Sequence, residues 1–258
     1  MRKLMFLVVL SIIGAGQVKA GACPTASLAF YVTNFASLSA SCTIGSLSFS
    51  DFASGSNLFA GSGTHSPDGE ANLSITPITS GVNGVGLMLT APSGWTAGAG
   101  GALDAEVPFE VSCTNGTACL TDLFMSMTGT STGTGTGTNP GSNDLLTESY
   151  CLGGVAAPPT APCSSGGVVQ DQLAINASNS GSTVTKTDNF SAVAKLSVLK
   201  DAAALGNGVP NATSTISSIL DEFSTNTVST PEPSSLLLLG SGLAGLAFLF
   251  KRRLGSLV

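Results

Sequence analysis

The sequence predicts an all-β body, a β-sandwich or jelly-roll-like domain, preceded by an N-terminal signal helix and followed by a single C-terminal transmembrane helix. The first observation is composition: 9% of the 258 residues are charged, 43% are hydrophobic and 32 are glycine. The second is a series of short segments with alternating apolar residues, separated by Gly, Asn, Ser and Pro, the pattern of strands and turns. The third is an uncharged apolar segment near each end.

The strand predictions follow from this alternation. In the segment Asp104–Cys113, the residues Ala105, Val107, Phe109 and Val111 alternate with others that are mostly polar, the period of a half-buried strand. The other predicted strands are Leu28–Phe35, Cys42–Phe49, Ala71–Pro77, Gly84–Thr90, Leu120–Thr128, Gln172–Ala177, Phe190–Leu199 and Thr213–Phe223. Many short strands at this spacing favour a sandwich.

The intervening segments are predicted to be irregular. Thr128–Asn143 repeats Gly-Thr, and Gly153–Gly167 is rich in Pro and Gly, so both are predicted loops. Asp201–Leu205 is rich in Ala and is a candidate helical turn. Trp95 follows Pro92-Ser-Gly, which indicates a turn.

All six cysteines lie in the body, and an even number in an exported chain indicates disulfides. Six cysteines allow many pairing schemes, and the sequence does not decide among them. Our prediction is the nearest-neighbour set, because short loops close at little entropic cost: Cys23–Cys42, Cys113–Cys119 and Cys151–Cys163. A zinc site is not expected, because the chain has no Cys-x-x-Cys and only one histidine, His65.

The body is strongly acidic. Between Gly21 and Thr230 it holds three basic and fourteen acidic residues, a net charge of −11. Phosphate groups are bound by Lys and Arg, so this composition excludes nucleic acid as a partner.

The front of the chain has the order of a secretory signal peptide. Arg2 and Lys3 precede an apolar run from Leu4 to Ile13, and small residues follow. This run is too short to span a membrane, and cleavage is predicted after Ala20 or Ala22. An uncleaved anchor is one alternative. Lipidation of Cys23 is another, although a larger aliphatic residue would be expected in place of Ala20.

The back of the chain has the pattern of a membrane helix. Ser234–Phe250 is a 17-residue stretch without charge, roughly 25 Å long as a helix. Lys251, Arg252 and Arg253 follow directly, which places the C-terminus in the cytoplasm by the positive-inside rule. The body then lies on the far side of the membrane, in agreement with the signal peptide. A plain anchor that is never cut is the alternative.

Pro231-Glu232-Pro233, the apolar stretch and the basic end at Lys251, Arg252 and Arg253 together resemble the PEP-CTERM sorting signal. The resemblance covers Pro231–Val258 and implies export through the Sec translocon and recognition by exosortase, a membrane cysteine protease that cuts near Pro-Glu-Pro. It also implies a Gram-negative-type envelope and an association with exopolysaccharide or biofilm. The predicted organisation is a signal peptide at 1–20, a sandwich at 21–223, a linker at 224–230 and the sorting signal at 231–258.

Candidate catalytic residues are few. His65 lies in a predicted turn, and no Gly-x-Ser-x-Gly motif or phosphate-binding loop is present. The acidic pairs Asp68 with Glu70, Asp104 with Glu106 and Asp221 with Glu222 are candidates for a glycosidase, which needs two carboxylates across a cleft; exposed strand carboxylates are the simpler interpretation. Asp68, Glu70 and Asn72 are also candidate calcium ligands, without the EF-hand spacing.

We therefore predict an exported, non-enzymatic protein with no catalytic residue, metal or cofactor. Its precursor is expected to be anchored in the inner membrane, and the mature protein to reach the cell surface or the medium in a structural or adhesive role. The first alternative is a carbohydrate-binding module that binds extracellular polysaccharide, with Trp95 as a stacking contact. The second is a secreted hydrolase.

Overall fold

The computed structural model describes residues 20–37, 39–53, 59–63, 73–133, 142–153, 169–176, 179–206 and 210–226. The chain divides into two units, Met1–Thr225 and Asn226–Val258. The elements described below all belong to the first unit, and the predicted signal peptide and C-terminal helix lie outside the described residues. Within those residues, no helix is both long and apolar enough to cross a membrane.

Long strands dominate the first unit, with one short helix near its beginning. The elements are β1 (Gly21–Ala22), β2 (Ala26–Ser27), α1 (Leu28–Asn34), β3 (Cys42–Ile44), β4 (Leu47–Ser50), β5 (Phe59–Ser62), β6 (Ser74–Gly81), β7 (Gly84–Ala97), β8 (Ala102–Cys113), β9 (Leu120–Ser131), β10 (Asn143–Leu152), β11 (Val169–Asn176), β12 (Thr183–Val193), β13 (Lys195–Leu205) and β14 (Ser214–Phe223). The prediction of an all-β body is confirmed.

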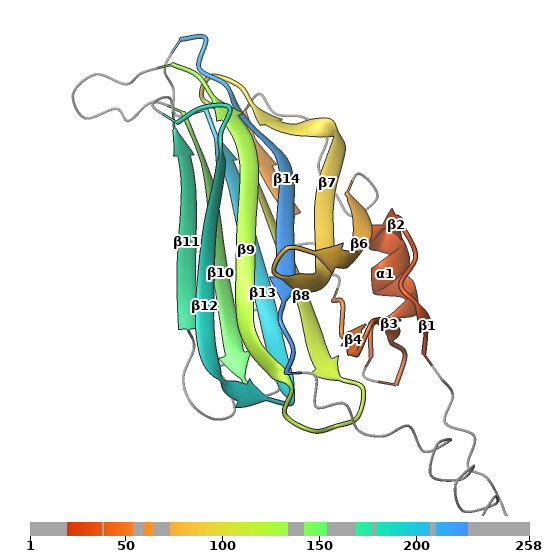
Figure 1. Ribbon diagram of the computed structural model, residues 1–258. Coiled ribbons are helices and arrows are strands. Elements are labelled where there is room, and N and C mark those ends of the chain that lie inside the picture. Colours follow the sequence, from red (N-terminus) through yellow and green to blue (C-terminus); the bar gives the residue numbers. More distant parts are fainter. Residues whose placement is uncertain are drawn as a thin grey trace, which may run out of the picture. The chain divides into compact units, whose positions relative to one another are not determined.

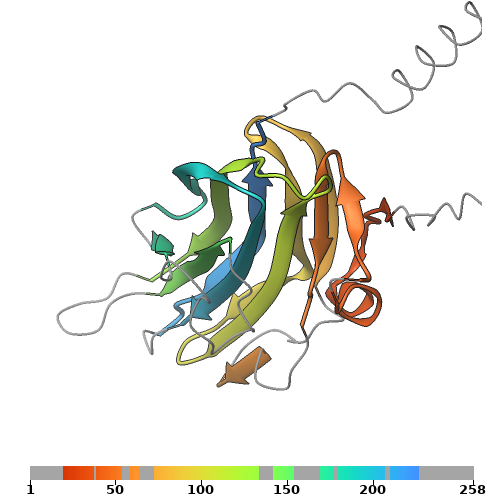
Figure 2. The same ribbon diagram turned by 90° about the horizontal axis from the view of Figure 1, so that it is seen from below.

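The strands form two sheets that pack face to face (Figure 1). The first, here the β8 sheet, has the order β1-β3-β4-β8-β13-β10-β11, with β5 also paired to β8. The second, here the β14 sheet, has the order β12-β9-β14-β7-β6-β2. Seen from below, the two layers curve around a shared interior and α1 lies at one edge (Figure 2). This architecture is sandwich-like.

Alternation along β8 shows how the sequence builds the interior. Leu103, Ala105, Val107 and Phe109 are buried, whereas Asp104 is exposed. Successive side chains of a strand point to opposite faces, so the buried set faces the β14 sheet. The period-two prediction is confirmed from Leu103 to Val107, whereas both faces are buried from there to Val111, Glu110 included.

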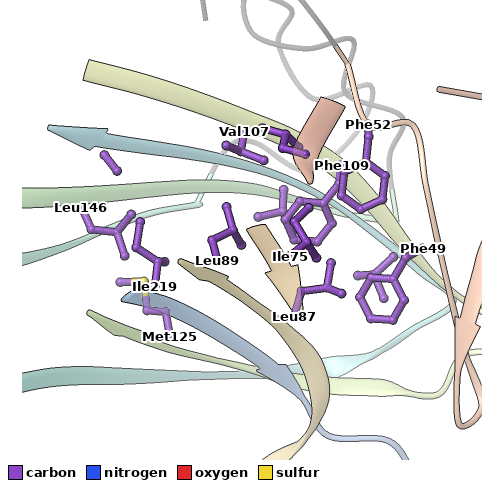
Figure 3. Close-up of a cluster of buried hydrophobic side chains, with 14 of the residues drawn as sticks. Phe49, Phe52, Ile75, Leu87, Leu89, Val107, Phe109, Met125, Leu146 and Ile219 are labelled. Carbon is purple, nitrogen blue, oxygen red and sulfur yellow. The ribbon is translucent and has the colours of Figure 1, made fainter. Parts of the chain in front are cut away.

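Aromatic rings fill the end of the interior nearest β4. The ring of Phe109 stacks on Phe52, with centroids 5.6 Å apart, and meets Phe49 and Phe223 at 6.4 Å each. Figure 3 shows Phe49, Phe52 and Phe109 on the side of the β8 sheet, with Leu87 and Ile75 of the β14 sheet opposite them. Ring pairs at such separations add to the burial of apolar area. This cluster is the main apolar core.

The predicted strand Leu28–Phe35 is wrong, because Leu28–Asn34 forms α1. The Ser27 hydroxyl caps the helix by accepting a hydrogen bond from the Phe30 amide at 3.2 Å. Leu28 and Tyr31, three residues apart, are the buried pair. That spacing puts both side chains on one face of a helix, whereas a strand would put them on opposite faces.

The predicted strand Cys42–Phe49 is instead a hairpin of β3 and β4. Ile44 pairs with Leu47, so Gly45 and Ser46 form a two-residue turn. Gly45 has a φ of +60°, which glycine adopts without steric cost. The alternation was read correctly, but the turn within it was missed.

The predicted strand Phe190–Leu199 is divided between the two sheets. β12 ends at Val193 in the β14 sheet, and β13 begins at Lys195 in the β8 sheet. The carbonyls of Val193 and Ala194 accept hydrogen bonds from the amides of Cys119 and Cys113. The chain therefore changes sheet next to the end of β8 and the start of β9, which bind its carbonyl groups. A local sequence pattern cannot predict these hydrogen bonds between distant segments.

Other predictions from local patterns also need correction. Asp201–Leu205 is the end of β13 rather than a helical turn, and Trp95 lies within β7 rather than in a turn. β10 was not predicted. In the predicted loop 128–143, β9 continues to Ser131, and residues 134–141 are outside the described residues, as are 154–168 of the second predicted loop.

Two of the predicted disulfides are confirmed: Cys23–Cys42 and Cys113–Cys119. The first fastens β1 to β3, which pair in parallel, and the second closes the connection between β8 and β9. Cys151 is also disulfide-bonded. Cys163, its predicted partner, lies outside the described residues.

Candidate functional site

Charged side chains occupy the interior at the end of the sandwich made by β10, β11 and β12. In the β8 sheet, Glu148 pairs with Asp171 on one side and with Lys200 on the other. In the β14 sheet, Lys186 and Asp221 both pair with Met125. The two rows face each other across the interior, because ion pairs join Asp171 to Lys186 and Lys200 to Asp221. We refer to these five ionisable side chains, without Met125, as the ionic layer.

Glu148, Lys200 and Asp221 form the centre of this layer. The Lys200 ammonium donates to Glu148 Oε2 at 2.6 Å and to Asp221 Oδ1. The exposed fractions are 1% for Lys200 and 0% for each carboxylate. We call these three residues the central triad. It joins two neighbouring strands of the β8 sheet to the middle of the β14 sheet.

The central triad contains one amino group, of Lys200, and two carboxyl groups, of Glu148 and Asp221. Burial, followed by the charge of Asp221, raises the pKa of Glu148 to about 8. Burial also raises the pKa of Asp221. Burial alone would lower the pKa of Lys200, but its two carboxylate neighbours outweigh that and raise it. At neutral pH Glu148 is therefore mostly protonated, and Lys200 keeps its proton.

Two buried oxygens of the triad, Glu148 Oε1 and Asp221 Oδ2, have no hydrogen-bond partner among the described residues. Two ionised carboxylates cannot bond to each other, because both only accept. A proton on Glu148 changes one of them into a donor. A hydrogen bond between the two carboxyl groups accordingly helps to raise the pKa of Glu148 and opposes the rise in the pKa of Asp221.

Two further polar pairs extend from the triad toward the edge strands. Lys186 contacts Asp171, and the Tyr150 hydroxyl donates to Asp188 Oδ2 at 2.6 Å. Burial and this hydrogen bond raise the pKa of Tyr150. Lys186 is about two-fifths exposed, so the ionic layer reaches solvent at β12.

Asp144 is a separate buried carboxyl group on β10. Ser214 donates its hydroxyl to Asp144 Oδ1, whereas Asp144 Oδ2 has no partner among the described residues. Burial raises the pKa of Asp144 to about 7, partly opposed by the Ser214 hydrogen bond. Asp144 is therefore close to half protonated at neutral pH.

The candidate pair Asp104 and Glu106 lies on the outer face of the β8 sheet. Glu106 pairs across the strands with Asp201. Burial, followed by a hydrogen bond with Asp104, raises the pKa of Asp201 to about 6. In the part of the chain that the structure describes, no group of three or more His, Cys, Asp or Glu is arranged to hold a metal ion. Further along the same face of the β8 sheet, Lys195 forms an ion pair with Glu110.

Trp95 is 5% exposed and belongs to the core. A sugar ring stacks on an exposed aromatic face, so the predicted carbohydrate contact does not fit this position. His65, Asp68, Glu70 and Asn72 lie outside the described residues, as do the sorting-motif residues Pro231, Glu232, Pro233, Lys251, Arg252 and Arg253.

The sequence reasoning missed the central triad. It paired Asp221 with Glu222 because they are adjacent, yet only Asp221 points into the sandwich; Glu222 Oε2 accepts from the Asn83 amide at 3.0 Å. The available signal was Lys200, which stands at a core position of β13 between Val198 and Ala202. A charge at such a position is rarely tolerated without a buried partner.

Comparison with protein families identifies the C-terminal segment. Residues 229–253 match the model described as the PEP-CTERM protein-sorting motif. The chain carries a PEP-CTERM sorting motif. This confirms the resemblance drawn from Pro231-Glu232-Pro233 and the basic end, and it makes the protein an exported one with a membrane-anchored precursor. The PEP-CTERM match covers none of the sandwich.

Two solved structures resemble the sandwich distantly. No curated protein matches the sequence. TmCBM61, solved with beta-1,4-galactotriose, aligns at a TM-score of 0.29 and 6% identity, over 63% of this chain and 86% of its own. The MgGH51 α-L-arabinofuranosidase, solved with arabinose, aligns at 0.23 and 10%, over 64% of this chain and 23% of its own. Likeness at this level carries no argument about function.

Proposed function

We propose that this PEP-CTERM protein is an exosortase substrate whose sandwich serves as a structural or adhesive component of the cell surface or extracellular matrix, associated with exopolysaccharide or biofilm. The observation that carries the proposal is the motif match at residues 229–253. The charge pattern supports it, since basic residues follow the apolar stretch directly while the body carries −11.

A non-enzymatic role is part of the proposal. Its support is the placement of the ionisable groups that the structure describes. Glu148, Lys200 and Asp221 are closed off between the sheets, where a substrate has no approach. Asp104 and Glu106 lie on the open face of a sheet, whereas a glycosidase holds its two carboxylates across a cleft.

The sorting step is tested by replacing Pro231, Glu232 and Pro233 with alanine in the native host. We expect the precursor to accumulate in the inner membrane and the mature form to disappear from the surface and medium, because exosortase then lacks its recognition site. Fractionation, followed by intact mass of each fraction, measures this and also locates both cleavage sites.

The matched control replaces Asn226, Thr227 and Val228, which precede the matched segment, with alanine. This variant should be sorted normally. Normal processing of the Pro-Glu-Pro variant would contradict the proposed role of exosortase. Unimpaired biofilm in a deletion strain, with no retention of the protein on the host's polysaccharide, would contradict the matrix role alone.

A further inference from the structure

The central triad brings an amine and a carboxyl group into contact inside a closed core. Lys200 Nζ contacts Asp221 Oδ1 from the opposite sheet, and Glu148 Oε2 lies 2.6 Å from the same nitrogen. On their own strands, Lys200 lies between Val198 and Ala202. The cross-strand neighbours of the triad include Val107, Leu87 and Met125. Figure 3 shows these three side chains lining the space between the sheets.

We propose that Lys200 and Asp221 join in an intramolecular isopeptide bond, formed by the folded chain itself, with Glu148 relaying protons. The bond links Lys200 Nζ to Asp221 Cγ and covalently staples β13 of the β8 sheet to β14 of the β14 sheet. This inference is independent of the proposed sorting and surface role.

The condensation balances without any co-reactant. Lys200 first passes one proton to Asp221 across their contact, which leaves a neutral amine and a neutral carboxyl group. Burial penalises both ions and so lowers the cost of this exchange relative to water, while the neighbouring carboxylates still favour the ammonium. The Lys200 nitrogen then attacks Asp221 Cγ, and a new N–C bond forms as the carbonyl electron pair moves to oxygen.

Glu148 completes the reaction. Its protonated form gives a proton to the carboxyl oxygen under attack, and its carboxylate then takes one from the attacking nitrogen. Glu148 then protonates one of the two Asp221 oxygens, which leaves as water. Its carboxylate takes the proton from the other oxygen as the carbonyl re-forms. Glu148 ends protonated, as it began, and the products are one amide and one water molecule.

Two physical factors favour the amide over the ion pair. The fold fixes nucleophile and carboxyl group together, so the step has the high effective concentration of an intramolecular reaction. The amide also replaces a buried ammonium and carboxylate, whose desolvation is expensive even when they are paired. The two oxygens left without partners belong to the groups that this step uses.

The pair Lys195 and Glu110 provides an internal comparison. Lys195 Nζ lies 2.9 Å from Glu110 Oε1. These two residues lie on the neighbouring strands β13 and β8 of one sheet. Lys195 is more than one-third exposed, and no second carboxylate bonds to its nitrogen among the described residues. Water can solvate this ammonium, so no condensation is expected there.

The test is peptide mapping of the full chain, expressed with its signal in a host without exosortase, then denatured, reduced, alkylated and digested with trypsin. If Lys200 is acylated, trypsin cannot cut after it. We expect no free Leu196–Lys200 peptide, and instead one Leu196–Lys251 peptide lighter than its calculated mass by one water molecule. Cleavage after Lys186 and Lys195 controls for digestion.

The Glu148→Gln variant keeps the shape of the relay but not its acid. It should release the Leu196–Lys200 peptide and show no loss of water. The matched Glu110→Gln variant should still lack that peptide. If the folded chain without substitutions released the Leu196–Lys200 peptide, the proposal would be overturned whatever the variants do. The central triad would then be a buried network of ion pairs.

Discussion

Asp221 and Glu222 are neighbours in the sequence, yet they meet different surroundings. Asp221 points between the sheets and contacts Lys200, whereas Glu222 accepts a hydrogen bond from the Asn83 amide at the β6–β7 turn. The reason is the period of two along β14. At the scale of single residues, the face that a buried carboxyl group occupies decides whether its partner is a backbone amide, as for Glu222, or an ammonium, as for Asp221.

Asp144 gives a prediction for the dependence of stability on pH. Its pKa rises from the ordinary value to about 7 in the folded state, so the folded chain binds the Asp144 proton more tightly than the unfolded chain. The free energy of unfolding should therefore fall as pH rises from about 4 to about 7, by up to about 4 kcal/mol, and this contribution should then level off.

The measurement is urea unfolding across that pH range. Asp144→Asn, which resembles the neutral form, should be more stable than the wild type at pH above about 7 and should lose this part of the slope. Gln172→Asn, which changes an exposed side chain on the neighbouring strand β11 without adding or removing a titrating group, is the control and should leave the slope unchanged. An identical slope in the Asp144→Asn variant would show that Asp144 is ionised in the fold.

At the scale of elements, the two described disulfides fasten different kinds of connection. β1 and β3 are two and three residues long, too short for a stable ladder, and Cys23–Cys42 ties the beginning of the chain to β3. Cys113–Cys119 closes the connection between β8 and β9, two long strands of different sheets. The two bridges therefore differ in what they restrain.

The disulfides should contribute unequally to stability. The sequence separations are 19 for Cys23–Cys42 and 6 for Cys113–Cys119. Loop-closure entropy then predicts a loss of about 3 kcal/mol for Cys23→Ser with Cys42→Ser, and about 2 kcal/mol for Cys113→Ser with Cys119→Ser. Chemical unfolding of the two double variants measures this difference. A larger loss for the short bridge would indicate that native contacts, rather than loop entropy, dominate.

At the scale of the whole molecule, the order of strands in space differs from their order in the chain. β14 is the last strand that the structure describes, but it lies in the middle of its sheet, between β9 and β7. It also supplies Asp221 to the central triad. The sandwich is therefore complete only when residue 223 is in place, shortly before the sorting motif at 229–253.

Truncation tests this dependence. A chain that ends after Asn226 should be exported and folded, because it keeps every strand of the unit Met1–Thr225. A chain that ends after Thr213 lacks β14 and should be degraded or protease-sensitive, since β9 and β7 lose their shared partner. Limited proteolysis of both chains gives the answer. Equal resistance would mean that the sheets assemble without the central strand.

The sequence by itself determined the all-β class, the alternation at the start of β8 and the sorting motif, and the nearest-neighbour rule correctly predicted two disulfide pairs. These features are encoded locally, in alternation, in short cysteine spacing and in a contiguous tripartite signal. Only the tertiary structure decided that Leu28–Asn34 is a helix, that the chain changes sheet at Ala194, and that Glu148, Lys200 and Asp221 meet. These depend on which strands lie side by side and on which faces oppose each other, and strand order in a sandwich is set by packing between distant segments rather than by any local pattern.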